Sequence, residues 1–267
     1  MNSLFPPERQ EGSAPEEPII PRMVQVRLPI SIPVVTYALI AICVLVFLAQ
    51  LASESAGRVY CGAVRGYADL PACMGMKINQ SIVQGELWRL FSPMFLHGSI
   101  IHIAFNMYAL FSLGPVLERY YGRWRYLVLF VLSGFSGNVL SFIMSRAASL
   151  GSSTAIFGLL GAEGVFLYQN RKWFGGMAQR QLSNLIMVAV VNLIIGMSPG
   201  IDNWGHIGGL MGGLAFAWLG GPVLRLQGLY PDLQLVDERQ EGDVFRASFI
   251  VGMIFACLAG MTIWLRR

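Results

Sequence analysis

Long uncharged stretches separated by short charged segments dominate the chain after residue 27. Six of these stretches contain no Asp, Glu, Lys or Arg over 19 to 28 residues, and a seventh, residues 147–170, is interrupted only by Glu163. Each stretch is close to the roughly 20 residues that a helix needs to cross a bilayer. The pattern predicts seven membrane helices, at about residues 32–53, 97–115, 125–145, 152–170, 182–198, 204–222 and 247–265.

The composition supports a membrane protein. Hydrophobic residues make up 55% of the chain and charged residues only 13%, whereas about 25% of the residues in a typical soluble domain are charged. Helices are expected because every backbone polar group in a bilayer must be paired within its own span. We therefore expect an all-α polytopic membrane protein in contact with the lipid bilayer. Lys and Arg are dispersed without a basic cluster, so no nucleic-acid partner is expected.

The polar segments divide the chain into four parts. Residues 1–31 are rich in Pro and Glu and contain no apolar signal sequence, so we expect a disordered tail. The membrane core would occupy residues 32–222 and include a long outer loop at residues 54–96. A linker at residues 223–246 would lead to an additional helix within residues 247–267.

The distribution of Lys and Arg predicts the orientation of the helices. With the N-terminus inside, twelve basic residues fall in inner segments and seven in outer segments, four of the seven in the long outer loop. Cytoplasmic loops of membrane proteins carry an excess of basic residues. We therefore expect a cytoplasmic N-terminus and linker, a C-terminus outside, and insertion in a bacterial plasma membrane.

Four polar residues lie within the apolar segments at one predicted depth. The second, fourth and sixth predicted helices all run from outside to inside. Their first turns contain His102 and Asn106, Ser153, and His206, respectively. Polar and ionisable groups inside a span are costly, so they mark a functional site by default. We expect these four side chains to converge in the outer part of the membrane.

The four side chains have the chemistry of an acyl-transfer site. A serine hydroxyl becomes a nucleophile when a base takes its proton, and His206 can serve as the base for Ser153. His102 and Asn106 are four residues apart and therefore share one helix face. Both can donate hydrogen bonds to the oxyanion of a tetrahedral intermediate, as can a backbone N–H at the start of a helix.

No carboxylate is placed to orient the imidazole of His206. Asp202, one turn before His206 at the outer end of the helix, is the only acid near this depth. Phe157 lies four residues after Ser153 on the same helix face and is better placed to pack against the imidazole. The sequence therefore predicts a Ser–His dyad.

Four motifs resemble those of rhomboid intramembrane serine proteases. They are ELWRLFSPMFLH before the second helix, HIAFN within it, GSSTAIFGLLGA at the fourth helix and GHIGGLMGG in the sixth. The resemblance implies a bundle of six helices plus a C-terminal seventh, and cleavage of single-span membrane proteins. It also implies that Ser153 is the nucleophile, that His206 is the base, and that His102 and Asn106 bind the oxyanion.

The resemblance extends to residues outside the dyad. Trp88 and Arg89 resemble a Trp-Arg pair in the first outer loop of the family, and Glu118 resembles a structural glutamate after the second helix. Thr154 departs from the usual Gly-x-Ser-Gly pattern by replacing its last glycine. Its β-branched side chain is expected to crowd the substrate backbone and narrow the specificity.

Two other classes of function remain open from the sequence. A catalytically silent rhomboid-like protein would bind membrane clients, and loss of Ser153 or His206 would mark it. A transporter or channel would carry polar residues through the full depth of the bundle. No Cys/His cluster has the spacing of a metal site, and no cofactor is expected.

The four cysteines fall into two groups. Cys61 and Cys73 lie in the outer loop, where an oxidising compartment would favour a disulfide between them. The other interpretation is two free thiols packed under the loop. Cys43 and Cys257 lie in predicted spans and are expected to act as small apolar side chains.

Overall fold

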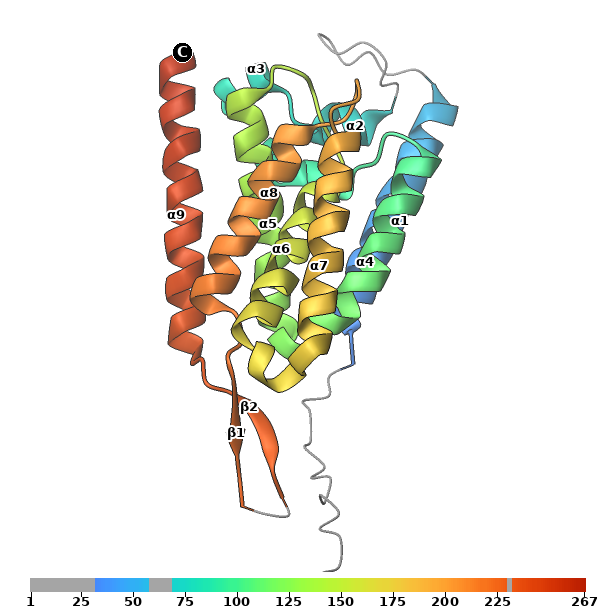
Figure 1. Ribbon diagram of the computed structural model, residues 1–267. Helices are drawn as coiled ribbons and strands as arrows, with labels where there is room; N and C mark the ends of the chain where they lie inside the picture. Colours follow the sequence, from blue (N-terminus) through green and yellow to red (C-terminus); the bar gives the residue numbers. More distant parts are fainter. Residues whose placement is uncertain (1–31, 58–68, 230–231) are drawn as a thin grey trace, which may run out of the picture.

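Seven long helices form a bundle within the residues that the computed structural model describes, which are 32–57, 69–229 and 232–267 (Figure 1). Successive long helices run in opposite directions along the bundle. The all-α polytopic class predicted from the sequence is confirmed. The long helices are α1 (Val34–Ala56), α4 (Ile100–Tyr121), α5 (Arg123–Met144), α6 (Ser153–Gln169), α7 (Arg171–Ile195), α8 (Asn203–Gly220) and α9 (Glu241–Arg266).

One end of the bundle, here called the loop end, is covered by residues 69–99. Asp69 caps the first short helix by accepting a hydrogen bond from the Ala72 backbone N–H. Helices α4, α6 and α8 all begin at the loop end (Figure 1), as the sequence predicts for the helices that carry the polar residues. The segments that cover this end are α2 (Leu70–Gly75), α3 (Asn79–Val83), η1 (Leu87–Leu90) and η2 (Ser92–Phe95).

The opposite end carries a β-hairpin that the sequence analysis did not predict. Strands β1 (Leu224–Gln227) and β2 (Gln234–Asp237) pair antiparallel and project from the bundle between α8 and α9 (Figure 1). The indole N–H of Trp173 donates to the carbonyl oxygen of Leu224 at 2.8 Å and fixes the base of the hairpin. Four-residue strands are too short to stand out as a hydrophobic pattern, and they lie in the segment expected to be a linker.

Five of the long helices, α1, α4, α5, α7 and α9, have the length and hydropathy of membrane spans. The other two, α6 and α8, are shorter and richer in glycine, and they lie at the centre of the bundle against α5. Because neighbouring helices surround them, their polar side chains face protein rather than lipid. The two shortest and most glycine-rich of the long helices are therefore the ones that carry Ser153 and His206.

Two helices begin earlier than predicted. Helix α7 begins at Arg171 and is kinked at Gly175 (φ 53°, ψ −137°), so that its long part starts after Gly175 rather than near residue 182, and α9 begins at Glu241 rather than at residue 247. In α9 a capping box between Gln240 and Asp243 extends the helix into polar sequence. Hydropathy marks the apolar part of a helix, and these polar first turns lie beyond it.

Glycines allow α6 and α8 to touch through their backbones. A Cβ on Gly209 would lie 1.9 Å from the carbonyl oxygen of Thr154, and a Cβ on Gly213 would lie 2.2 Å from that of Gly158. Any larger residue at either position would force the helices apart. Small residues permit this kind of approach in a membrane, and here it brings the first turn of α8 against the first turn of α6.

Helix α9 packs on the outside of the bundle against α5 and α8. At the loop end the guanidinium of Arg266 donates to the carbonyl oxygens of Phe142 and Ile143 at 2.8 and 2.9 Å. These carbonyls belong to the last turn of α5, which has no intrahelical partners for them. The additional helix therefore caps a core helix at the end of the bundle that carries the polar residues.

Two predictions concern parts of the chain that the structure does not describe. Cys61 and the N-terminal tail at residues 1–31 lie outside the described residues. The disulfide to Cys73 and the disorder of the tail therefore stay predictions.

Candidate active site

Ser153 and His206 meet at the loop end of the bundle. The Ser153 Oγ lies 2.9 Å from the Nε2 of His206, although the two residues are 53 positions apart in the chain. Ser153 is the first residue of α6, and His206 lies in the first turn of α8. The close approach of the two helices therefore places a hydroxyl within hydrogen-bond distance of an imidazole, as acyl transfer requires.

Phe157 fixes the plane of the imidazole. The rings of Phe157 and His206 are stacked, with centroids 4.3 Å apart and an interplanar angle of 8°. The Nδ1 of His206 is buried and has no hydrogen-bond partner among the described residues. The ring is therefore held by stacking and by the Ser153 hydroxyl, in the arrangement predicted for a dyad.

His102 lies against the backbone that precedes the serine. Its backbone N–H donates to the Ser99 Oγ at 3.1 Å, which caps α4. Gly151 has a φ of 134°, and a Cβ there would lie 2.7 Å from the Nε2 of His102 and 3.6 Å from the Ser153 Oγ. Gly151 thus leaves room for the His102 ring beside Ser153, and its positive φ suits only glycine.

Asn106 provides an unused donor one turn deeper in α4. Its side chain is buried, and its amide nitrogen has no hydrogen-bond partner among the described residues. A buried donor without a partner is costly unless it binds a ligand or water. The amide can therefore donate to a bound group, and its role toward an oxyanion stays a prediction.

Ser152 is occupied by a different histidine. The Nε2 of His97 lies 3.2 Å from the Ser152 Oγ. His97 is held in turn by Gln50 of α1, which accepts from the His97 backbone N–H at 3.0 Å and donates to its carbonyl oxygen at 3.1 Å. The two adjacent serines thus have separate imidazole partners, and Ser153 alone contacts His206.

The sequence analysis did not include Gln50 and His97 in the candidate site. Gln50 is the one amide side chain in the first apolar stretch, and a buried polar residue in a span is itself a sign of function or specific packing. Its partner is a backbone 47 residues away, which no local pattern could identify.

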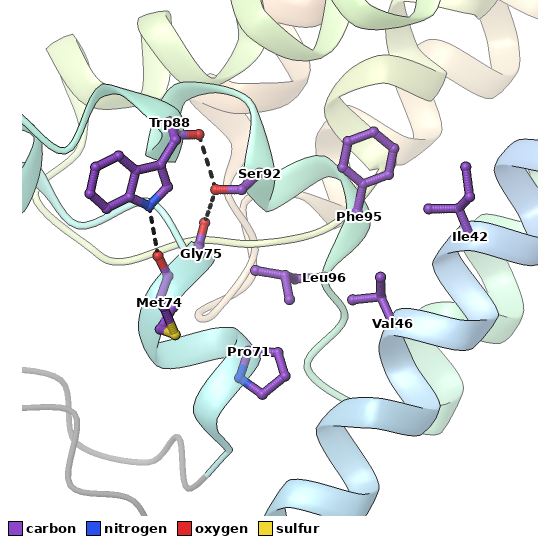
Figure 2. A pocket seen from close by; sticks show the side chains of 9 residues that line it. All are labelled: Ile42, Val46, Pro71, Met74, Gly75, Trp88, Ser92, Phe95 and Leu96. Atoms are coloured by element: carbon purple, nitrogen blue, oxygen red, sulfur yellow. Dashed lines mark hydrogen bonds between the residues drawn. The ribbon is translucent and has the colours of Figure 1, made fainter.

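Trp88 and Arg89 hold the loop end together, and within the described residues their side-chain hydrogen bonds go to neighbouring loop residues rather than to Ser153 or His206. The indole N–H of Trp88 donates to the Met74 carbonyl oxygen at 2.9 Å, beside an apolar pocket between α1 and the short helices (Figure 2). Arg89 is buried, and it pairs with Glu86 and donates to the Met76 carbonyl oxygen at 2.9 Å. Both side chains tie η1 to α2.

Glu118 is buried near the hairpin end, four turns of α4 beyond the site residues. Its carboxylate accepts hydrogen bonds from the backbone N–H groups of Val35 and Thr36 at 2.9 and 2.7 Å, and from the Thr36 hydroxyl at 2.8 Å. A carboxylate at the start of a helix satisfies unpaired N–H groups and favours the dipole. Glu118 therefore joins α4 to the first turn of α1, which is a structural role.

Thr154 does not lie where its side chain could crowd the backbone of a substrate. Its side chain is buried and packs between α5 and α8, where it contacts the positions of Gly137 and Gly205. A Cβ on either glycine would come within 3 Å of Thr154. The expectation that Thr154 crowds a substrate is therefore corrected: glycines on two neighbouring helices accommodate it inside the bundle.

Among the residues that the structure describes, no group of three or more His, Cys, Asp or Glu could hold a metal. Serine, histidine and amide side chains carried by three helices have the chemistry that acyl transfer uses.

Residues 84–223, which include the four site residues, match the Rhomboid domain family. Rhomboid protease GluP of Bacillus subtilis (strain 168) is 45% identical over 150 residues, which are 55% of this chain and 29% of that protein. RHOMBOID-like protein 9, chloroplastic, of Arabidopsis thaliana is 35% identical over 180 residues, which are 67% of this chain and 40% of that protein. RHOMBOID-like protein 6, mitochondrial, of the same plant is 37% identical over 142 residues, 52% of this chain and 46% of that protein. The matches span less than half the length of each relative.

Proposed function

Because the chain belongs to the rhomboid family, and is thus an integral membrane protein, we propose that it is an intramembrane serine endopeptidase with Ser153 as nucleophile and His206 as base. The contact between the Ser153 Oγ and the His206 Nε2 at 2.9 Å carries the proposal. Stacking of Phe157 on the imidazole supports it.

The reaction follows from these contacts. His206 takes the proton of Ser153 while Oγ attacks a substrate carbonyl carbon, and the carbonyl oxygen becomes an oxyanion. His102, the free amide of Asn106 and the backbone N–H of Ser153 are donors for that charge. The intermediate collapses to an acyl-enzyme when the C–N bond breaks and His206 protonates the leaving amine. Water then attacks the ester and gives a proton to His206. His206 returns a proton to the Ser153 Oγ as the acid product leaves, and the hydroxyl is restored.

The substrate we propose is a single-span membrane protein. His102, Ser153 and His206 lie in the first turns of helices at the loop end and Asn106 lies one turn deeper, so the scissile bond would lie near one side of the membrane. With the N-terminus in the cytoplasm, as the basic residues indicate, that side is outside. A helix hides its carbonyl groups in hydrogen bonds, so the substrate must be locally unwound where it is cleaved.

The alternative is a catalytically silent member that binds membrane clients. A protein that only binds clients has no need for a serine in contact with an imidazole or for a buried, unused amide donor. The presence of both favours the protease.

Cleavage of a single-span reporter in liposomes tests the proposal. The parent should cleave the reporter and react with a fluorophosphonate at Ser153, and Ser153→Ala should do neither. Ser152→Ala is the matched control, because that neighbouring hydroxyl contacts His97 instead. Cleavage by Ser153→Ala at the parent rate, or fluorophosphonate labelling lost in Ser152→Ala but kept in Ser153→Ala, would exclude the assignment.

A further inference from the structure

A buried lysine lies close to the first turn of α8, the helix that carries His206. Lys77, between α2 and α3, has no exposed surface. Its Nζ donates to the Ser141 Oγ at 2.9 Å, and the carbonyl oxygens of Ser141 and Ser145 lie 3.4 Å away. Burying a charge is costly unless it is hydrogen-bonded and compensated, so this lysine requires an explanation.

Asp202, the N-cap residue of α8, provides the compensating charge. The hydroxyl of Ser141 connects it to Lys77. The Ser141 Oγ donates to one carboxylate oxygen of Asp202 while it accepts from Lys77. One hydroxyl has a single proton and two lone pairs, so it can serve both partners at once. Lys77 at the loop end, Ser141 on α5 and Asp202 before α8 therefore form one connected chain.

Asp202 connects this chain to the base. Its other carboxylate oxygen accepts from the Gly205 N–H at 3.0 Å, and its carbonyl oxygen accepts from the His206 N–H at 3.2 Å. Both carboxylate oxygens are thus occupied, one by the N-cap bond and one by Ser141. The start of α8, including the backbone of His206, is held against α5 and the loop end.

The charge of Asp202 also has a direct chemical consequence. His206 becomes an imidazolium when it takes the serine proton, and it does so in the first turn of a helix, where the macrodipole is positive. The carboxylate one turn earlier offsets that field. The groups that face the imidazole from other helices are Ser153, Phe157 and His102, and none of them is an acid.

We propose that Lys77, Ser141 and Asp202 form a positioning array that holds His206 against Ser153 and stabilises its imidazolium, in a dyad that lacks a third residue. The inference rests on the proposed protease function. It assigns a role to three residues that touch neither the nucleophile nor the substrate. They are positioning residues, and their effect should appear in kcat and not in KM.

Asp202→Asn tests the array most directly, because asparagine caps helices as well as aspartate does but has no charge. We expect kcat for reporter cleavage to fall about 3- to 30-fold, the range of a charge acting on a helix terminus, with KM near the parent value. Because Lys77 loses its compensating charge, the unfolding temperature should also fall, so cleavage is measured well below it. Ser141→Ala, which breaks the connection and keeps both charges, should lower kcat in the same way. Asp243→Asn is the matched control, since it makes the same change in the first turn of α9 and should leave kcat unchanged.

Lys77→Met completes the experiment as a double-mutant cycle with Asp202→Asn. If the two residues act as one array, the double variant should lose little more kcat than either single variant. Parent kcat in Asp202→Asn, a loss confined to KM, or fully additive losses would overturn the inference. Ser153→Ala is run alongside: if it cleaves like the parent, the protease assignment itself fails, and if it is inactive while Asp202→Asn matches the parent, only the array is wrong.

Discussion

Two adjacent serines in this protein have different partners because of a single-residue offset. Ser152 faces His97, which is fixed by Gln50, whereas Ser153 faces His206. Each hydroxyl is within hydrogen-bond distance of an imidazole, so that distance alone does not identify a nucleophile. The stacked Phe157 beside His206 makes Ser153 the better candidate.

Asn106→Ala should lower the cleavage rate about 10²- to 10³-fold, which is the usual cost of losing one oxyanion donor. KM should change little, because the bond forms only when the oxyanion develops. Steady-state kinetics with the reporter in liposomes measure both constants. Asn192→Ala, at an exposed position on α7, is the control. A parent rate in Asn106→Ala would mean that this amide does not bind the oxyanion.

Lys77 should make the stability of the protein depend on pH. Burial lowers the pKa of Lys77 from 10.5 to about 8, although the carboxylate of Asp202 acts in the opposite direction. The folded protein then binds fewer protons than the unfolded chain between pH 8 and 10.5. The free energy of unfolding should therefore rise with pH in this window, by up to about 1.4 kcal/mol per pH unit, and this contribution is lost as the pH falls through 8.

Unfolding in mixed micelles across this pH window, for the parent and Lys77→Met, provides the measurement. The parent should gain stability relative to Lys77→Met as the pH rises. Lys172→Met, which removes an exposed lysine of α7, reports any general effect of losing a lysine. A difference between parent and Lys77→Met that does not vary with pH would contradict the prediction.

At the scale of elements, the contact between α6 and α8 determines the site. Ser153 and His206 each occupy a first turn, and they meet only because glycines let the two backbones touch. The register of that contact sets the depth of the base relative to the nucleophile. A shift of one helix along the other by a single turn, about 5.4 Å, would separate the two side chains.

Gly209→Ala should destabilise the protein and abolish or strongly reduce cleavage. The new Cβ would lie 1.9 Å from the Thr154 carbonyl oxygen, and overpacking of this kind typically costs about 1–3 kcal/mol. Gly260→Ala is the matched control, because nothing lies within 4 Å of that position in α9; it should be neutral or slightly stabilising. Thermal unfolding and reporter cleavage measure the two effects. Equal stability of the two variants would show that the contact is looser than described.

Hydropathy and depth were sufficient to predict the seven long helices and the approach of Ser153, His206 and His102 at one end of the bundle, whereas the role of Asn106 stays a prediction. The fold of the long loop could not be predicted in this way, because it depends on contacts between distant residues such as Lys77 and Ser141. From the sequence, Asp202 was only the one acid near the depth of His206, one turn before it at the outer end of the helix, and its contacts could not be predicted. The direction of Thr154 also depended on glycines of other helices, which no local pattern reveals.

At the scale of the whole molecule, the site lies toward one end of the bundle. A substrate helix would have to present an accessible carbonyl at that depth. Helices with Gly or Pro near the same end can unwind there at lower cost, because Pro removes a hydrogen bond and Gly lowers helix propensity by about 1 kcal/mol.

Replacing the helix-weakening residues of a reporter with Leu should therefore slow cleavage. The measurement is the initial rate in liposomes with the parent enzyme, at equal reporter density. Leu replacements of Gly or Pro in the other half of the same reporter are the control and should have little effect. If both sets slow cleavage equally, local unwinding at the site is not the requirement.

The glycine contacts also determine how the helices should exchange their amide hydrogens. Local opening at Gly209 or Gly213 requires α8 to leave α6, so those amides should exchange with deuterium only through global unfolding. Helix α7 has little buried surface and can separate from the bundle without disturbing the Ser153–His206 contact. In detergent solution its amides should therefore exchange well before those of α6 and α8, and a map of deuterium uptake would divide the protein into a rigid centre and a loosely held helix beside it.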